Sequence, residues 1–411
     1  MKTKVLMFGW EFPPYNSGGL GTACFGLTKA LSSKNIDIVF VLPKPVNIKS
    51  DKIKIKFAED QAGMTINPQD YLLAPYKSPD QYQNDKLPGR ESVYGNSLFD
   101  EIGRYGKNAR FIAKEYEFDI IHAHDWMSFP AGIEAKKVSG KPLIVHVHST
   151  EIDRTGGNNI NSEIFRIEKT GMETADAVIA VSNLTKKIIV DNYHINPGKI
   201  HVVHNGIDVY DYPSIDADSA AVIKLKEMGN KIVLFVGRIT VQKGPDYFLK
   251  AAKKVLQYNR DVFFVIAGSG DMEHQIITEA AELGISDRVL FAGFLRGEEL
   301  NKVYRMADLF VMPSVSEPFG ITALESVVNG TPVLVSKQSG VKEVLTHVLT
   351  ADFWDTDEMA NKILAVLNYK SLELTLKENS IEQVKNLSWQ ETARKCIDIY
   401  RQILDSYFLR V

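Results

Sequence analysis

Short runs of apolar residues alternate with longer helical patterns through most of the chain. In the first half the clearest runs are VLMF from Val5, IVFVL from Ile38, DIIH from Asp119, LIVHV from Leu143 and AVIAV from Ala177. In the second half they are IVLFV from Ile232, VFFVIA from Val262, VLFA from Val289, LFVM from Leu309 and PVLV from Pro332. These runs are continuous rather than alternating, which is typical of parallel strands covered on both faces.

Helical patterns fill the intervals between the apolar runs. In the segment 244–258, Phe248, Ala252 and Val255 fall on one helical face. Further helices are predicted over 21–33, 163–175, 184–193, 272–283 and 298–307, and the pattern from 358 to 411 is helical. Repeated βα units with right-handed crossovers predict an α/β fold.

The length of 411 residues exceeds what one hydrophobic core normally serves, so two domains are expected. We place the junction near HNGID, His204 to Asp208, where Asn-Gly marks a turn, giving domains over 1–206 and 207–388. A final helix, about 389–411, is expected to pack back on the first domain. The stretch 43–95 interrupts the alternation of predicted strands and helices. It contains an alternating run at 52–57, and we predict a β-rich or loop insertion there.

Composition excludes several classes of protein. A net charge of −3 gives no electrostatic case for binding nucleic acid or an anionic membrane. Two cysteines, Cys24 and Cys396, are too few for a disulfide framework or a zinc site. No apolar run approaches the roughly 18 residues of a membrane span, and the N-terminal apolar stretch is too short for a signal peptide. We therefore expect a cytoplasmic protein without an integral membrane contact.

Two fixed cations stand at the end of a predicted strand, in VGRITVQKG from Val236 to Gly244. Arg238 and Lys243 flank a short loop, and a helix begins at Gly244. Unpaired backbone N–H groups and the helix dipole favour negative charge at a helix N-terminus. Cations beside such a terminus predict a diphosphate-binding site.

Two carboxylates surround a Pro-Phe-Gly turn in PSVSEPFGITALE, from Pro313 to Glu325. Glu317 precedes Pro318, which disfavours a helical conformation at Glu317, whereas Glu325 lies inside the helix that follows. Carboxylates accept hydrogen bonds from vicinal hydroxyls, which suits sugars. Together with the cations, they predict a site for a sugar joined to a diphosphate.

Histidines close two neighbouring strands of the predicted sheet, in HAHDW from His122 and in HVHSTE from His146. The carboxyl ends of strands in open α/β sheets face the ligand crevice, which favours functional roles for His124, Asp125 and His148. His122 and His124 share a direction if the strand continues that far. No third metal ligand lies within reach along the sequence, and no cysteine is adjacent, so we predict no metal site.

A glycine-rich turn, WEFPPYNSGGLG from Trp10, follows the first predicted strand. Gly18 and Gly19 lie where the strand gives way to a helix, which allows a ligand to approach the backbone. A flexible loop with an ordinary helix cap explains the same residues.

These motifs together resemble those of retaining glycosyltransferases of the GT-B fold, of family 4/5 type, over nearly the whole chain. The motifs are the GGLG loop, HAHDW, HNGID, FVGRITVQKG and SEPFGITALE. HAHDW is most similar to the bacterial and archaeal glycogen and starch synthases. The resemblance implies two Rossmann-like, doubly wound domains facing a central cleft. It also implies an acceptor-binding first domain, a donor-binding second domain and no metal or cofactor beyond the nucleotide sugar.

The resemblance also implies a role for each matched residue. His124 would contact the transferred sugar, and Arg238 and Lys243 would hold the diphosphate. Glu317 would bind sugar hydroxyls and Glu325 the ribose. The remaining assignments are donor contacts by Gly18, Gly19, Phe319, Gly320 and Ile321, and acceptor or sugar contacts by Asp125 and His148.

The glycine-rich loop differs from the family pattern at one position, so the donor and the acceptor are not fixed by the resemblance. Glycogen and starch synthases carry a Lys in the glycine-rich loop, where this chain has Asn16 and Ser17. We expect UDP- or ADP-glucose as donor and a glucan as acceptor. Alternatives are a transferase for a surface polysaccharide or another glycoconjugate, a sugar-nucleotide epimerase, and a non-catalytic sugar-nucleotide or glucan binding protein. The sequence carries no prediction of the oligomeric state.

Overall fold

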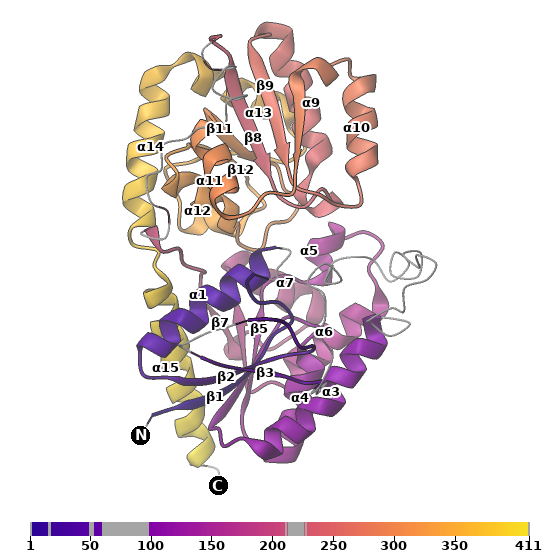
Figure 1. Ribbon diagram of the computed structural model, residues 1–411, viewed down its shortest axis with the longest axis vertical. Coiled ribbons are helices and arrows are strands. Elements are labelled where there is room, and N and C mark those ends of the chain that lie inside the picture. Colours follow the sequence, from indigo (N-terminus) through magenta and orange to yellow (C-terminus); the bar gives the residue numbers. More distant parts are fainter. Residues whose placement is uncertain are drawn as a thin grey trace. The chain divides into compact units, whose positions relative to one another are not determined.

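The chain divides into two compact units, which we describe separately (Figure 1). The computed structural model describes residues 2–14, 18–48, 53–59, 98–209 and 228–409, together with positions 212 and 226. Unit 1 comprises Met1–Glu151, Ile160–Gly206 and Trp389–Val411. Unit 2 comprises Ile152–Asn159 and Ile207–Ser388. The first unit is therefore built from chain segments on both sides of the second.

Within the described residues, unit 1 holds a parallel sheet of seven strands in the order β3-β2-β1-β4-β5-β6-β7. The strands are β1 (Lys4–Phe8), β2 (Asp37–Leu42), β3 (Lys54–Phe57), β4 (Ile120–His124), β5 (Leu143–Val147), β6 (Ala177–Ala180) and β7 (Ile200–Val202). Strand order reverses between β1 and β4. In doubly wound sheets, ligands bind beyond the carboxyl ends of the strands at this switch point.

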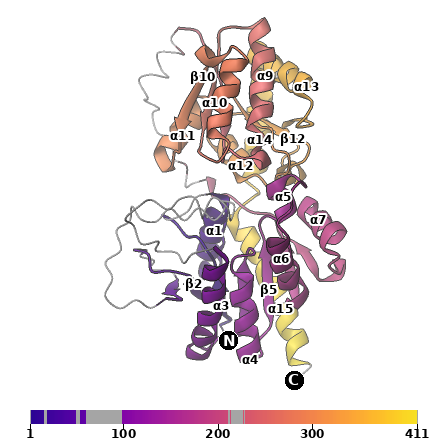
Figure 2. The same cartoon turned by 90° about the vertical axis from the view of Figure 1, so that its right-hand side faces the viewer.

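Helices cover both faces of the unit 1 sheet (Figures 1 and 2). They are α1 (Gly19–Ser33), α3 (Leu98–Glu115), α4 (Phe129–Ser139), α6 (Ser162–Thr174), α7 (Asn183–Tyr193) and α15 (Trp389–Phe408). α3, α4 and α6 pack side by side on one face, and α1 packs against α15 on the other. The approach is close at Gly26 of α1, where an added Cβ would lie 2.2 Å from the Trp389 ring.

Unit 2 repeats this plan, with six described parallel strands in the order β10-β9-β8-β11-β12-β13 and a switch point between β8 and β11. The strands are β8 (Lys231–Val236), β9 (Val262–Ala267), β10 (Val289–Gly293), β11 (Leu309–Met312), β12 (Val333–Ser336) and β13 (Leu349–Ala351). The α-helices are α5 (Glu151–Thr155), α9 (Pro245–Tyr258), α10 (Glu273–Glu282), α11 (Gly297–Met306), α12 (Ile321–Val328), α13 (Thr356–Asn368) and α14 (Lys370–Val384). Helix α13 packs on α9, and Val233, Phe248 and Phe264 lie in the core.

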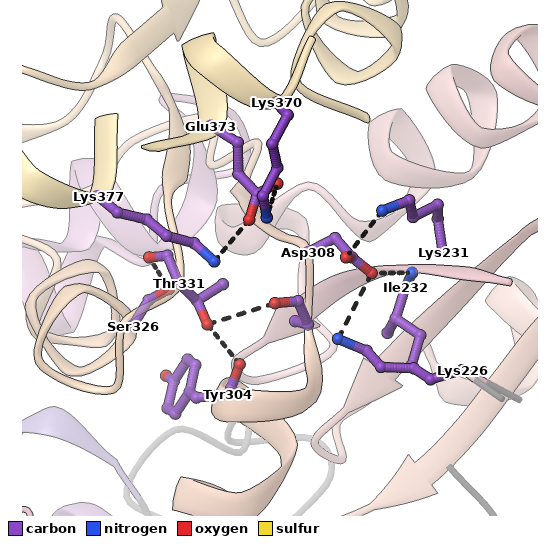
Figure 3. A network of polar contacts seen from close by, with 11 residues as sticks. Lys226, Lys231, Ile232, Tyr304, Asp308, Ser326, Thr331, Lys370, Glu373 and Lys377 are labelled. Atoms are coloured by element: carbon purple, nitrogen blue, oxygen red, sulfur yellow. Dashed lines mark hydrogen bonds and ion pairs between the residues drawn. The ribbon is translucent and has the colours of Figure 1, made fainter. Parts of the chain in front are cut away.

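A polar network ties the amino ends of β8 and β11 together (Figure 3). Asp308 accepts a hydrogen bond from the backbone N–H of Ile232 at 2.8 Å. Its carboxylate also pairs with Lys231 at 3.5 Å and with Lys226 at 3.8 Å. This network lies at the strand ends opposite the switch-point loops, so we assign it a structural role.

The predicted α/β class is confirmed, and each of the ten predicted apolar runs forms a strand. Within the alternating run at 52–57, Lys54–Phe57 form a strand, β3, which pairs parallel to β2. The rest of the predicted insertion falls largely outside the described residues. Strands β7 and β13 and helix α4 were not predicted, because they are short or have weak sequence patterns. Helix α3 was missed although its buried apolar residues recur at helical spacing.

Candidate active site

The loop after β8 in unit 2 is held against the end of β11. Gly244 has φ +64°, and an added Cβ would lie 2.3 Å from the carbonyl oxygen of Pro313. The backbone N–H of Val315 donates to the carbonyl of Gln242 at 2.9 Å. Because only glycine permits this backbone approach, the loop that carries Lys243 is brought beside the loop that carries Glu317.

Lys243 and Glu317 form an ion pair at this switch point. The Lys243 Nζ atom lies 2.5 Å from Glu317 Oε2, and the Ser314 hydroxyl donates to the same oxygen at 3.2 Å. The Glu317 backbone is fixed in turn, since its N–H donates to Gln338 and its carbonyl accepts from Gly340, both at 2.9 Å. One predicted cation and one predicted carboxylate are thus placed together and oriented.

Arg238 follows β8 and lies in the same loop as Lys243. Its Nη2 atom donates to Oε1 of the buried Gln242 at 2.9 Å. The contact restricts a long side chain before any ligand binds, which lowers the entropy cost of using its charge. Gln242 was not singled out in the sequence, because a glutamine in a loop carries no signal of its own.

Helix α12 begins at the turn that contains Phe319 and Gly320. Gly320 has φ +110° and precedes Ile321, the first helical residue, and no side chain of the described part of the chain caps this end of the helix. The carbonyl of Phe319 accepts a hydrogen bond from Val341 at 2.6 Å, which fixes the turn. An uncapped helix N-terminus suits an anionic ligand.

Glu325 lies on the second turn of α12, partly buried. The Tyr304 hydroxyl donates to Glu325 Oε2 at 3.2 Å. Burial raises the pKa of Glu325, and the hydrogen bond from Tyr304 opposes that rise. Thr331 in turn donates to the Tyr304 carbonyl at 2.5 Å (Figure 3). Tyr304 thus links Glu325, a residue predicted to bind the sugar donor, to Thr331 in the interior of unit 2.

Residues 152–159 group with unit 2 although they lie within the predicted first domain. The Ser316 hydroxyl donates to Oδ1 of the buried Asp153 at 2.5 Å. An added Cβ at Gly156 would lie 3.1 Å from Val315. This segment therefore supports the loop that leads to Glu317. The local sequence gives no signal of this contact, because it joins residues 163 positions apart.

Four histidines gather at the carboxyl ends of β4 and β5 in unit 1. His122 and His124 share one face of β4, with ring centroids 4.3 Å apart. His146 and His148 continue the group from β5, with centroids 4.2 Å apart. His124 Nδ1 lies 3.0 Å from His148 Nε2, and His122 Nδ1 lies 2.7 Å from the Tyr400 hydroxyl of α15. Both strand-end motifs therefore point to one face of the sheet.

These imidazoles are neutral at physiological pH. Burial lowers the pKa of His122 to about 3 and the pKa of His124 and His146 well below the usual range. The pKa of His148 is lowered as well, although part of this residue stays exposed. In the neutral form one ring nitrogen donates a hydrogen bond, and the other can accept one or bind a metal ion.

No third metal ligand lies close to His122 and His124 along the sequence, but the fold brings further histidine and cysteine side chains to them, and the absence of a metal site stays a prediction. Ligand atoms of Cys24, His124 and His148 all lie within 4.8 Å of one another, and so do those of His122, His124 and His146. These side chains are distant in the sequence but close in the structure, because β5 pairs beside β4 and α1 packs over the same face.

Asp125 and the glycine-rich turn complete the candidate residues of unit 1. Asp125 has φ +59°, and its Oδ1 accepts from the backbone N–H of His148 at 2.7 Å and of Ser149 at 3.3 Å. Gly18 is the N-cap of α1 and Gly19 its first residue, and an added Cβ at Gly18 would meet no atom of the described residues within 4 Å. Asn16 and Ser17 lie outside the described residues. Gly18 and Gly19 belong to unit 1, whereas the other predicted donor contacts belong to unit 2.

Two protein-family models match this chain. Residues 17–210 match the model described as Glycosyltransferase Family 4, and residues 217–383 match the model described as Glycosyl transferases group 1. An uncharacterized glycosyltransferase of Methanocaldococcus jannaschii is 30% identical over 97% of this chain and 98% of its own length. The chain belongs to this family of glycosyltransferases.

Two further relatives carry different acceptors in their names. A D-inositol 3-phosphate glycosyltransferase of Nocardioides is 29% identical over 77% of this chain and 72% of its own length. A glycogen synthase of Mycobacterium tuberculosis is 25% identical over 84% of this chain and 80% of its own length. The predicted glycosyltransferase family is confirmed, whereas its glycogen synthase branch stays a prediction.

Solved structures confirm the GT-B fold. Sucrose-phosphate synthase from Thermosynechococcus elongatus aligns with a TM-score of 0.78 at 20% identity, over 98% of this chain and 100% of its own. HepE from Anabaena, in complex with UDP and glucose, aligns with a TM-score of 0.72 at 17% identity, over 97% of this chain and 100% of its own.

No helix among the described residues is long and apolar enough to cross a membrane.

Proposed function

We propose that this glycosyltransferase moves a glucosyl unit from UDP- or ADP-glucose to a sugar hydroxyl at a glucan non-reducing end, with retention of configuration. The observation that carries this proposal is the Lys243–Glu317 pair beside the uncapped N-terminus of α12. It supplies a cation for a phosphate and a carboxylate for sugar hydroxyls. HepE, a structural relative, is named as a complex with UDP and glucose, which supports the donor class.

Lys243 and Glu317 can each serve a ligand while staying paired. An ammonium group has three N–H donors, so contact with Glu317 leaves donors for a phosphate oxygen. Among the described residues, both hydrogen bonds of the Glu317 carboxylate fall on Oε2. Oε1 is then the acceptor for a sugar hydroxyl. Arg238, oriented by Gln242, adds a second positive charge.

We assign the leaving diphosphate a double role in the reaction. The bond between the anomeric carbon and the phosphate oxygen breaks through an oxocarbenium-like transition state, as in other glycosyl transfers. The acceptor oxygen attacks the same face, and its proton passes to the departing phosphate oxygen. Arg238 and Lys243 stabilise the charge that develops there. His124 contacts the transferred sugar, and Glu325 binds the ribose.

Substitution of Lys243 tests this role. Lys243→Ala should lower kcat by a factor on the order of 10²–10³, because one preorganised electrostatic contact to the transition state is lost. Lys250→Ala is the matched control, since Lys250 lies half exposed in α9 and pairs with Asp246. Turnover of Lys243→Ala near the wild-type rate would contradict the mechanism.

The choice of substrates is tested by nucleotide release. UDP-glucose and ADP-glucose are each incubated with glycogen, with D-inositol 3-phosphate and without acceptor. Release that depends on glycogen supports the proposal. Release only with D-inositol 3-phosphate assigns the acceptor that the Nocardioides relative is named for. Binding of nucleotide sugar without release in any reaction indicates a non-catalytic binding protein and rejects the proposal.

A further inference from the structure

Three aromatic side chains form a connected group on unit 2, which we call the aromatic platform. Phe353 and Trp354 follow strand β13, and Tyr247 lies in the first turn of α9. The ring centroid of Phe353 is 5.0 Å from that of Tyr247 and 4.8 Å from that of Trp354, and both pairs meet edge to face. The three rings come together because α13, which begins at Thr356, packs on α9.

Trp354 is the exposed end of the platform. It keeps 58% of its surface exposed, whereas Trp10, Trp126 and Trp389, the other tryptophans of the chain, are buried. An apolar residue ahead of the N-cap Asp355 commonly packs against the helix that follows. That packing does not account for an indole that stays largely in water at a cost in hydrophobic free energy. Exposed apolar groups of this kind favour a binding role.

The turn that carries Trp354 is fixed by hydrogen bonds. The backbone N–H of Asp355 donates to the carbonyl of Asp352 at 3.0 Å, which closes the turn around Trp354. The Asp352 carboxylate in turn accepts hydrogen bonds from Lys337 and Gln338, both at 2.9 Å. An aromatic side chain also has few rotatable bonds. The indole is therefore held in place before a ligand binds, which lowers the entropy cost of binding.

The chemistry of the platform and its surroundings suits a sugar. The face of an aromatic ring carries partial negative charge, and the axial C–H groups on the face of a glucose ring carry partial positive charge. The hydroxyls project from the edge of the same sugar and need polar partners. Lys250 Nζ lies 4.9 Å from the Tyr247 ring centroid, and Lys254 pairs with the exposed Asp357 at 2.6 Å. Charged donors and acceptors thus accompany the rings.

The small extent of the platform favours a sugar over a protein partner. Stable protein–protein interfaces bury about 1,200–2,000 Å² in total. The platform offers one exposed indole, since Tyr247 and Phe353 are partly buried behind it. One aromatic ring matches the face of one glucose unit.

We propose that the aromatic platform is an accessory carbohydrate site, on which one glucose unit of a glucan chain stacks against the Trp354 indole. The glucan is the acceptor of the proposed function, so the identity of this ligand rests on that proposal. Tyr247 lies four residues after Lys243, so the platform adjoins the loop of the candidate donor site within unit 2. Binding a second unit of the same chain raises the effective concentration of acceptor ends.

Tryptophan fluorescence tests the site in the wild-type protein without a donor. The other three indoles are buried, so iodide should quench the emission of Trp354 selectively. We expect maltoheptaose, a linear glucan, to protect this emission from iodide and to shift its maximum to shorter wavelength. No protection up to the solubility limit of maltoheptaose would overturn the proposal. Protection that grows with protein concentration in the absence of sugar would assign the platform to a second copy of the chain instead, and would also overturn it.

Two variants at Trp354 assign the stacking ring. Trp354→Ala should weaken maltoheptaose binding, measured by calorimetry, by about tenfold, because the stacking contact and its buried area are lost. Trp354→Phe should keep most of the affinity, since a ring remains, but should lose the fluorescence response. Tyr258→Ala is the matched control, because Tyr258 ends the same helix α9 and is 80% exposed. Equal affinities of the wild type and Trp354→Ala would reject the assignment.

The accessory site and the proposed function fail separately. Glycogen-dependent nucleotide release without protection of Trp354 rejects the accessory site alone. Protection of Trp354 without glycogen-dependent release supports the site and rejects glucan as the acceptor of the transfer. Where release occurs, Trp354→Ala should raise KM for glycogen by about tenfold and leave kcat unchanged, because binding that is equal in ground and transition states affects KM only. A fall in kcat with unchanged KM would contradict an accessory role.

Discussion

The side chain of Glu325 makes the free energy of unfolding depend on pH. Burial raises its pKa above the unfolded value near 4.5, so the folded state holds the proton more tightly than the unfolded state. The stabilising effect of protonation is fully present below the unfolded pKa and is lost as pH rises through the folded pKa. The slope is at most about 1.4 kcal/mol per pH unit, and less here because the residue is partly exposed.

Glu325→Gln should remove this slope. We expect the variant to gain stability relative to wild type as pH rises from 4.5 to 7, measured as the free energy of urea unfolding. Donor affinity should fall in the same variant, because the amide accepts ribose hydroxyls less strongly than a carboxylate does. Glu282→Gln is the control at an exposed position of α10. An unchanged slope in Glu325→Gln would show that this carboxyl titrates normally.

The candidate site was predictable at the residue level where charge and glycine occur together in one motif. Lys243 and Glu317 were predicted for one site because each lies at a strand end beside a helix start. Their ion pair places the two side chains together, and their roles in binding stay predictions. Cys24, Gln242 and Asp153 carry no such local signal. Their positions depend on strand order and helix packing, which residue types alone do not encode.

Helix α15 depends on close packing at one glycine of α1. An added Cβ at Gly26 would lie 2.2 Å from Trp389 Cε2, whereas at Gly103 of α3 it would meet nothing within 4 Å. Gly26→Ala should therefore destabilise unit 1 by about 1–3 kcal/mol, the usual cost of overpacking. Gly103→Ala should stabilise it by up to about 1 kcal/mol through helix propensity.

Thermal unfolding of both variants measures this difference. Because the two substitutions are chemically identical and both lie in helices, any difference between them reports the packing at Trp389. Equal Tm values would show that the ring moves away without cost, and that α1 and α15 are held by other contacts.

Elements with long, continuous apolar runs were predicted correctly, since burial on both faces of a parallel sheet imposes that pattern. Helix α4 is mostly small and mixed residues, FPAGIEAKKVS. β7 and β13 span three residues each. Such elements owe their conformation to the neighbours they pair with, so local sequence predicts them poorly.

At the scale of the molecule, α15 completes a unit whose other elements come almost 200 residues earlier. Its Tyr400 hydroxyl contacts His122 of β4, and Trp389, Cys396 and Tyr400 are buried. Removing 389–411 should expose this face of the unit 1 sheet. Each large apolar side chain lost costs about 1.5–3 kcal/mol, so unit 1 should unfold locally or lose most of its stability.

Hydrogen exchange with mass spectrometry distinguishes the units in this truncated chain. Peptides from β4 and β5 should exchange much faster than in the full chain, whereas peptides from β8 and β9 should keep their protection. A chain that lacks only 409–411 is the control, since Leu409 is exposed. Equal acceleration in both units would mean that they unfold as one cooperative body.

The late position of α15 in the chain has a consequence for synthesis. A ribosome finishes β7 at Val202 and then makes unit 2 before it reaches Trp389. At ~5–20 residues per second, that interval lasts roughly 10–40 s. During it, the nascent first sheet has no covering over part of one face, whereas unit 2 emerges with almost all of its own elements in sequence. The half of the molecule translated first is therefore the half that matures last.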